Sequence, residues 1–202
     1  MIVIVDIGMG NLGSIQNMFK RIKVEAKISF DPSEIDKASK LILPGVGAFD
    51  NAMTSLQQRG LIDILNQKVR NDRTPILGIC LGMQLLGSES EEGKMQGLGW
   101  IDAKTVRFQF RPNGYKIPHM GWNSVEIKKE PGIFTGIDEP RFYFVHSYHL
   151  VCEHEEDILT TTPYGYDFVS SVHHKNIWGT QFHPEKSHKF GMKLFSNFAR
   201  LD

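Results

Sequence analysis

Short apolar segments alternate with helix-like segments through the first half of the chain, and no other feature constrains the fold as strongly. Met1–Ile7 is almost continuously apolar, as expected of a strand that is buried on both faces. Asn11–Ile22 instead carries apolar residues at the spacing of a helix. Strands are expected at 1–7, 24–30, 40–43 and 74–80, and helices at 11–22, 48–58, 61–70 and from 83 onward. This alternation predicts an α/β fold in which helices flank a mostly parallel sheet.

After Gly99 the expected elements are short, closely spaced and rich in β-forming residues. Phe168–His173 and Ile177–Phe182 are predicted to form a hairpin that turns at Lys175 and Asn176. Further strands are expected at 105–110, 123–128, 141–145, 149–152 and 157–162, and a final helix at 189–200. The second half therefore predicts an antiparallel extension of the parallel sheet. Since the sequence shows no linker or repeat, residues 1–202 are expected to form one domain.

Composition excludes several classes of protein. Lys and Arg together number 23, as do Asp and Glu, so no net field favours nucleic acid or an anionic membrane. The two cysteines, Cys80 and Cys152, suit a reducing compartment rather than a disulfide framework. The apolar start is too short to cross a bilayer and has no basic segment before it. A cytoplasmic protein is expected, and no cluster has zinc-like spacing, so neither metal nor cofactor is expected.

Residues 78–82 read Gly-Ile-Cys-Leu-Gly and lie between an apolar strand and a helical segment. This is the nucleophile-elbow pattern with Cys80 in the serine position. The turn holds its nucleophile in a strained backbone conformation, which requires small neighbours. It also places the sulfur at the positive end of the following helix, where a thiolate is favoured. Cys80 is therefore predicted to be a nucleophile, whereas Cys152, inside a strand-like segment, is expected to be structural.

A cysteine nucleophile needs a general base, and the chain has eight histidines. His183 is the strongest candidate because it follows the expected strand Ile177–Phe182, and parallel-sheet active sites collect at strand ends. Glu185, two residues later, can accept a hydrogen bond from the imidazole and fix its tautomer. Cys80, His183 and Glu185 are thus the predicted catalytic triad.

A glycine-rich turn, Pro44-Gly45-Val46-Gly47, follows the expected strand at 40–43. Its N–H groups could join that of Leu81 in holding an oxyanion, and one such donor typically lowers a barrier by about 2.7–4 kcal/mol. The alternative is an ordinary turn. The three features together indicate acyl transfer.

Three motifs, PGVG, GICLGMQLL and QFHPEKS, together resemble those of the class I glutamine amidotransferases. Within that family, DIGMGNLGS, KIPHMGWN and FYFVHSYH resemble the glutaminase subunits of imidazole glycerol phosphate synthases. The resemblance implies a flavodoxin-like fold and hydrolysis of glutamine to glutamate and ammonia. It also implies a heterodimer with a (β/α)₈-barrel cyclase subunit, which receives the ammonia.

The resemblance also implies roles for individual residues. Val46, Gly47 and Leu81 would form the oxyanion hole. Substrate glutamine would be bound by Gln84, Glu92, Ser147 and Tyr148. The partner would be contacted by Asn11, His119, Met120, Trp122, Tyr143 and Lys186.

Gly13 departs from the pattern, because the histidine-pathway subunits are expected to carry Arg or a similar residue there. The form GNLGSIQNM resembles paralogues that supply ammonia to a partner forming an amidino group on a surface-polysaccharide sugar. Two further alternatives remain open at this point: a stand-alone cysteine hydrolase and a non-catalytic binding protein. The intact Cys80–His183–Glu185 pattern favours catalysis over the last of these.

Overall fold

The computed structural model describes residues 1–111, 114–130 and 132–201. Within them an 11-stranded mixed sheet runs in the order β2-β1-β3-β4-β13-β12-β10-β6-β5, and β11 and β8 continue from β12. The first five strands pair in parallel, as the sequence predicted. Their bounds are β2 Ala26–Ser29, β1 Ile2–Val5, β3 Lys40–Gly45, β4 Ile76–Cys80 and β13 Ile177–Thr180.

The antiparallel extension is also confirmed. β12 pairs antiparallel with β13, and the two form the predicted hairpin across Lys175 and Asn176. β10 pairs antiparallel with β12 and β6, and β11 pairs antiparallel with β12 and β8. The bounds are β5 Glu89–Ser90, β6 Ala103–Arg107, β8 Glu126–Ile127, β10 Tyr148–Cys152, β11 Ile158–Pro163 and β12 Asp167–His174.

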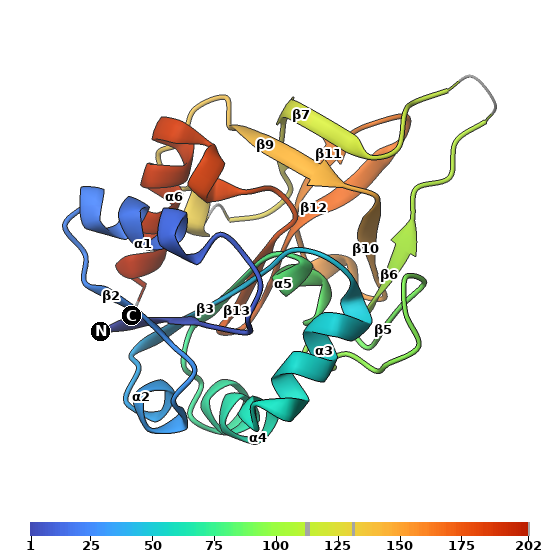
Figure 1. Cartoon of the computed structure of the whole chain (residues 1–202). Coiled ribbons are helices and arrows are strands. Elements are labelled where there is room, and N and C mark those ends of the chain that lie inside the picture. Colours follow the sequence, from blue (N-terminus) through green and yellow to red (C-terminus); the bar gives the residue numbers. More distant parts are fainter. Residues whose placement is uncertain (112–113, 131, 202) are drawn as a thin grey trace.

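Two strands leave the main sheet. β7 (His119–Ser124) and β9 (Arg141–His146) pair antiparallel as a separate two-stranded sheet. A strand was expected at 123–128, but β7 ends at Ser124 and only β8 (Glu126–Ile127) joins the main sheet. In Figure 1 this small sheet lies beside the carboxyl ends of the central strands, on the same side as α6.

Helices cover both faces of the parallel sheet (Figure 1), with α1 and α6 together on one face and α2, α3 and α4 on the other. Alternate residues of β1 show why: Ile2 and Ile4 pack with α1 and α6, whereas Val3 and Val5 pack in the opposite cluster. The bounds are α1 Leu12–Arg21, α2 Pro32–Asp36, α3 Phe49–Gln58, α4 Leu61–Asn66, α5 Leu81–Gln84 and α6 His188–Ala199. Short 3₁₀ turns occupy Gly132–Phe134, Glu155–Asp157 and Pro184–Lys186.

Some helix boundaries differ from those expected. The helix predicted at 61–70 is α4 followed by a π-helical turn over Gln67–Asn71. The short helix α2 was not predicted, although the sequence carries its signal. Asp31 caps it by accepting a hydrogen bond from the Ser33 N–H (2.8 Å), and Pro32 occupies its first turn.

Candidate functional site

The predicted nucleophile lies at the end of the central strand β4, between β3 and β13. Cys80 has a φ of +56°, the left-handed region that costs an ordinary side chain about 1–3 kcal/mol. It is 7% exposed and directly precedes α5. Because β3 and β13 are parallel neighbours of β4, the segments that follow both strands meet at this sulfur.

The elbow is possible only because its glycines allow close packing. A Cβ on Gly82 would lie 1.8 Å from the carbonyl oxygen of Leu43 in β3. A Cβ on Gly78 would lie 2.7 Å from the carbonyl oxygen of Gly82. Both contacts are with backbone atoms, which could move aside only if the strand or helix itself shifted. The absence of a side chain at the two glycines therefore allows α5 to pack directly against the sheet.

Gly82→Ala is expected to destabilise the fold by about 1–3 kcal/mol, the usual cost of overpacking a closed core. Urea unfolding monitored by circular dichroism measures this loss. Gly13→Ala is the matched control, because no atom lies within 4 Å of the corresponding Cβ on the surface of α1. Equal stability of the two variants would contradict this account of the elbow.

The predicted base and its orienting carboxylate are joined. His183 Nδ1 lies 2.8 Å from Glu185 Oε1, and the two side chains are 3% and 2% exposed. Nδ1–H donates to this carboxylate, which leaves Nε2 for the reaction. Ser187 also donates a hydrogen bond to the His183 carbonyl (2.7 Å) and so holds the turn.

Burial lowers the pKa of His183, but Cys80 and Glu185 outweigh this effect, and the net pKa lies above its usual value. Among the described residues, Nε2 of His183 has no hydrogen-bond partner. Cys80 thus makes no hydrogen bond to Nε2 in this structure. It still lies near enough to raise the pKa of His183, together with Glu185. A raised pKa keeps a proton on His183, which is the form that can protonate a leaving group.

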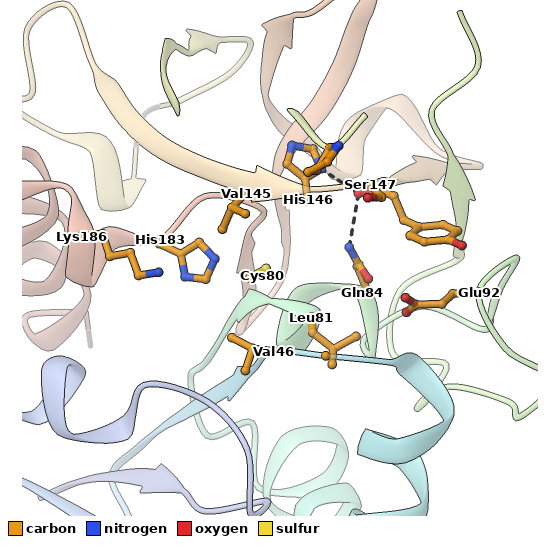
Figure 2. A pocket seen from close by; sticks show the side chains of 13 residues that line it. Val46, Cys80, Leu81, Gln84, Glu92, Val145, His146, Ser147, His183 and Lys186 are labelled. Atoms are coloured by element: carbon orange, nitrogen blue, oxygen red, sulfur yellow. Dashed lines mark hydrogen bonds between the residues drawn. The ribbon is translucent and has the colours of Figure 1, made fainter. Parts of the chain in front are cut away.

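One cavity of about 350 Å³ opens over the sulfur and brings the predicted substrate and oxyanion residues together. In Figure 2, His183 and Gln84 lie on opposite sides of Cys80, with Val46 and Leu81 below. Gly47 has a φ of +97°, which permits its unusual turn. The lining residues are Val46, Gly47, Cys80, Leu81, Gln84, Glu92, Pro118, Val145, His146, Ser147, Tyr148, His183 and Lys186.

Two of the predicted substrate residues are already engaged by the protein. Glu92 Oε2 accepts a hydrogen bond from the Phe49 N–H at 2.9 Å, which ties the Glu92 loop to α3. Gln84, 5% exposed, donates to the carbonyl of Tyr148 (3.3 Å) and to Oε1 of Gln181 (3.1 Å). The cavity wall is thus held in place from several elements.

The predicted partner residues are exposed or half-buried, with one exception. On β7, Met120 is 61% and Trp122 is 42% exposed, and Asn11 is exposed at the start of α1. Lys186 Nζ lies over the ring of Tyr143 at 5.7 Å. His119, expected on the contact surface, is instead buried, because alternate side chains of β7 point inward.

His119 forms an interior pair with His146 that sequence reasoning did not predict. Their Nδ1 and Nε2 atoms lie 2.9 Å apart, and His146 Nδ1 donates to the Tyr148 carbonyl at 2.7 Å. Burial lowers the pKa of His119 to about 4 and that of His146 to about 3. Both rings are therefore neutral at pH 7. The sequence carried a signal for His146 alone, because Phe142 and Phe144 alternate with it and would share its buried face.

Gln181 is the second residue that sequence reasoning missed. It follows β13 and is completely buried, and its Nε2 lies 3.7 Å from the sulfur of Cys80. The signal was present, since Gln181 stands two residues before His183 in an extended segment, and alternate residues of such a segment share a face.

Comparison with known proteins identifies the family. Residues 3–201 match the family model described as glutamine amidotransferase class-I. This chain belongs to that family. It is accordingly a class I glutamine amidotransferase.

Several relatives match this class I amidotransferase over their whole length. It is 57% identical to "Imidazole glycerol phosphate synthase subunit HisH 2" of Methanococcus maripaludis, over 99% of each chain. It is 52% identical to the protein of that name from Pseudomonas aeruginosa, over 100% of each. A "HisH" subunit of Sulfurimonas denitrificans is 50% identical, over 99% of this chain and 98% of the other.

Solved structures support the fold. A crystal structure of a glutamine amidotransferase superposes with a TM-score of 0.76 at 21% identity and covers 97% of this chain and 96% of the other. A glutamine amidotransferase from Thermotoga maritima gives 0.64 at 18% identity, over 96% and 79%. Across the described residues, no helix is both long and apolar enough to cross a membrane. In the same part of the chain, no group of three or more His, Cys, Asp or Glu side chains could hold a metal ion.

Proposed function

We propose that this amidotransferase is the glutaminase subunit of an imidazole glycerol phosphate synthase and works in the cytoplasm, in histidine biosynthesis. It supplies ammonia to a (β/α)₈-barrel cyclase subunit, which makes imidazole glycerol phosphate and an aminoimidazole carboxamide ribotide. The observation that carries the proposal is 57% identity, over 99% of both chains, with a relative of that name.

In the proposed reaction, the Cys80 thiolate attacks the carboxamide carbon of glutamine. N–H groups of Val46, Gly47 and Leu81 stabilise the oxyanion. The C–N bond then breaks, His183 gives its proton to the departing nitrogen, and ammonia leaves a glutamyl thioester. Water, deprotonated by His183, hydrolyses the thioester to glutamate. The raised pKa of His183 and its bond to Glu185 support its role as acid.

An exposed apolar surface supports docking of a partner. Met120 and Trp122 are large, apolar and exposed on β7, and residues of both types are enriched at protein interfaces. Pro118 and Lys186 line the cavity mouth beside this strand. A partner bound at Met120 and Trp122 would cover the opening of the cavity over Cys80. Ammonia released in the cavity could then reach the partner without entering water, where near pH 7 it is largely protonated to ammonium, which is not nucleophilic.

One observation favours the alternative acceptor, a partner that forms an amidino group on a sugar. Gly13 lies exposed in α1, with no atom within 4 Å of a Cβ built on it. Packing therefore does not exclude an arginine there, so the glycine is compatible with a partner surface that differs from that of the histidine-pathway subunits.

The test is stimulation by the partner's ligand. The chain is used to capture its partner from the source cells, and glutamate release is measured with and without the histidine-pathway intermediate. A rise of about 5- to 150-fold, the usual range of coupling between sites, is expected. Trp122→Ala is the control, because losing a central interface aromatic typically costs at least about 2 kcal/mol of binding. Stimulation by an activated sugar alone would transfer the proposal to the alternative acceptor.

A further inference from the structure

Gln181, which is not part of the predicted triad, places a buried amide against the reacting sulfur. Its side chain is completely buried, and Nε2 lies 3.7 Å from Cys80 Sγ. A completely buried amide must satisfy its polar atoms within the protein. It does not line the cavity, so contact with substrate does not explain its position.

The surroundings determine which end of this amide faces the sulfur. Gln181 Oε1 accepts a hydrogen bond from Gln84 Nε2 at 3.1 Å, and Gln84 Nε2 also donates to the Tyr148 carbonyl at 3.3 Å. If the Gln181 amide were turned over, two NH₂ groups would face each other and an oxygen would face the sulfur. The network therefore fixes the donor toward Cys80.

We propose that Gln181 stabilises the thiolate of Cys80 by donating an N–H to it, and that Gln84 holds Gln181 in the orientation that does so. Hydrogen bonds to a charged acceptor are stronger than those to a neutral one, so this donor favours the thiolate over the thiol. The proposal rests on the role of Cys80 in the proposed function. In this proposal the two residues have different roles at Cys80. His183 accepts the proton of the thiol, and Gln181 stabilises the negative charge of the resulting thiolate.

Titration of the thiol tests this directly, without substrate or partner. In a Cys152→Ala background Cys80 is the remaining cysteine of the chain, so its alkylation by iodoacetamide can be followed against pH. Gln181→Met keeps the length of the side chain and removes the donor. The apparent pKa of the Cys80 thiol is expected to rise by about one to two units, the equivalent of one hydrogen bond to a charged group. Gln84→Met, which only frees the orientation of Gln181, is expected to give a smaller rise.

Ser171→Ala is the matched control, since its buried hydroxyl donates to the Gly179 carbonyl at 2.7 Å, between β12 and β13 and away from the sulfur's own strand β4. It is expected to lower stability without moving the thiol titration. An unchanged titration in Gln181→Met, in a protein that unfolds cooperatively, overturns the proposal. If that variant does not fold, an unchanged titration in Gln84→Met has the same consequence. A shifted thiol titration in a chain with no glutaminase activity would support the role of Gln181 and count against the proposed function.

Discussion

Cys80→Ala is expected to abolish glutamine hydrolysis, with a fall in kcat of about 10⁶-fold, as when the nucleophile of a triad enzyme is removed. The cavity and the His183–Glu185 pair remain, but without the sulfur no thioester forms. Glutamate release is the measurement, made on the complex with the partner. Binding of the partner is expected to persist, because Cys80 is buried and contributes little to the protein surface.

Cys152→Ala is the matched control for this loss. Cys152 lies at the end of β10, and burial raises the pKa of its thiol to about 12, so it is a poor nucleophile near neutral pH. This variant should retain the parent rate. Glutamine-dependent turnover at the parent rate in Cys80→Ala would refute the thioester mechanism.

Acidification from pH 6.5 to 5 is expected to destabilise the fold by about 3 kcal/mol, through His119 and His146 alone. In the unfolded chain both rings take up a proton near pH 6.5, whereas in the fold their pKa values are about 4 and about 3. The unfolded state thus binds about one more proton than the fold at pH 6.5 and about two more at pH 5, and each costs about 1.4 kcal/mol per pH unit. Burial also lowers the pKa of His149 and His173, which acts in the same direction.

His183 does not reverse this trend. Its folded pKa is raised, so its stabilising effect is fully present below the unfolded value and is lost only as pH rises through the folded one. Urea unfolding at pH 7.5, 6 and 5 measures the slope. The double variant His119→Asn, His146→Gln should be less stable at pH 7.5 but should lose less on acidification. Equal losses in parent and variant would contradict the assignment.

The core of the site could be predicted from sequence because it depends on local patterns at strand ends. Cys80 and His183 each follow a short apolar run, and parallel strands bring such ends to one edge of the sheet. The position of β7 and β9 could not be predicted in this way. Pairing between strands is a non-local choice, and the inward face of β7, which buries His119, depends on which strand it joins. Gln181 was missed for a related reason, since only the fold brings its amide to the sulfur.

The central place of β4 has a consequence for how the enzyme is made. β4 needs β13 on one side, and β13 is among the last strands to leave the ribosome. Until then the nascent chain carries its nucleophile on an open sheet edge, without His183, Glu185 or Gln181. The strand that closes this edge and the residues that activate the thiol arrive together. A nascent chain that has not yet reached His183 is therefore expected to release no ammonia.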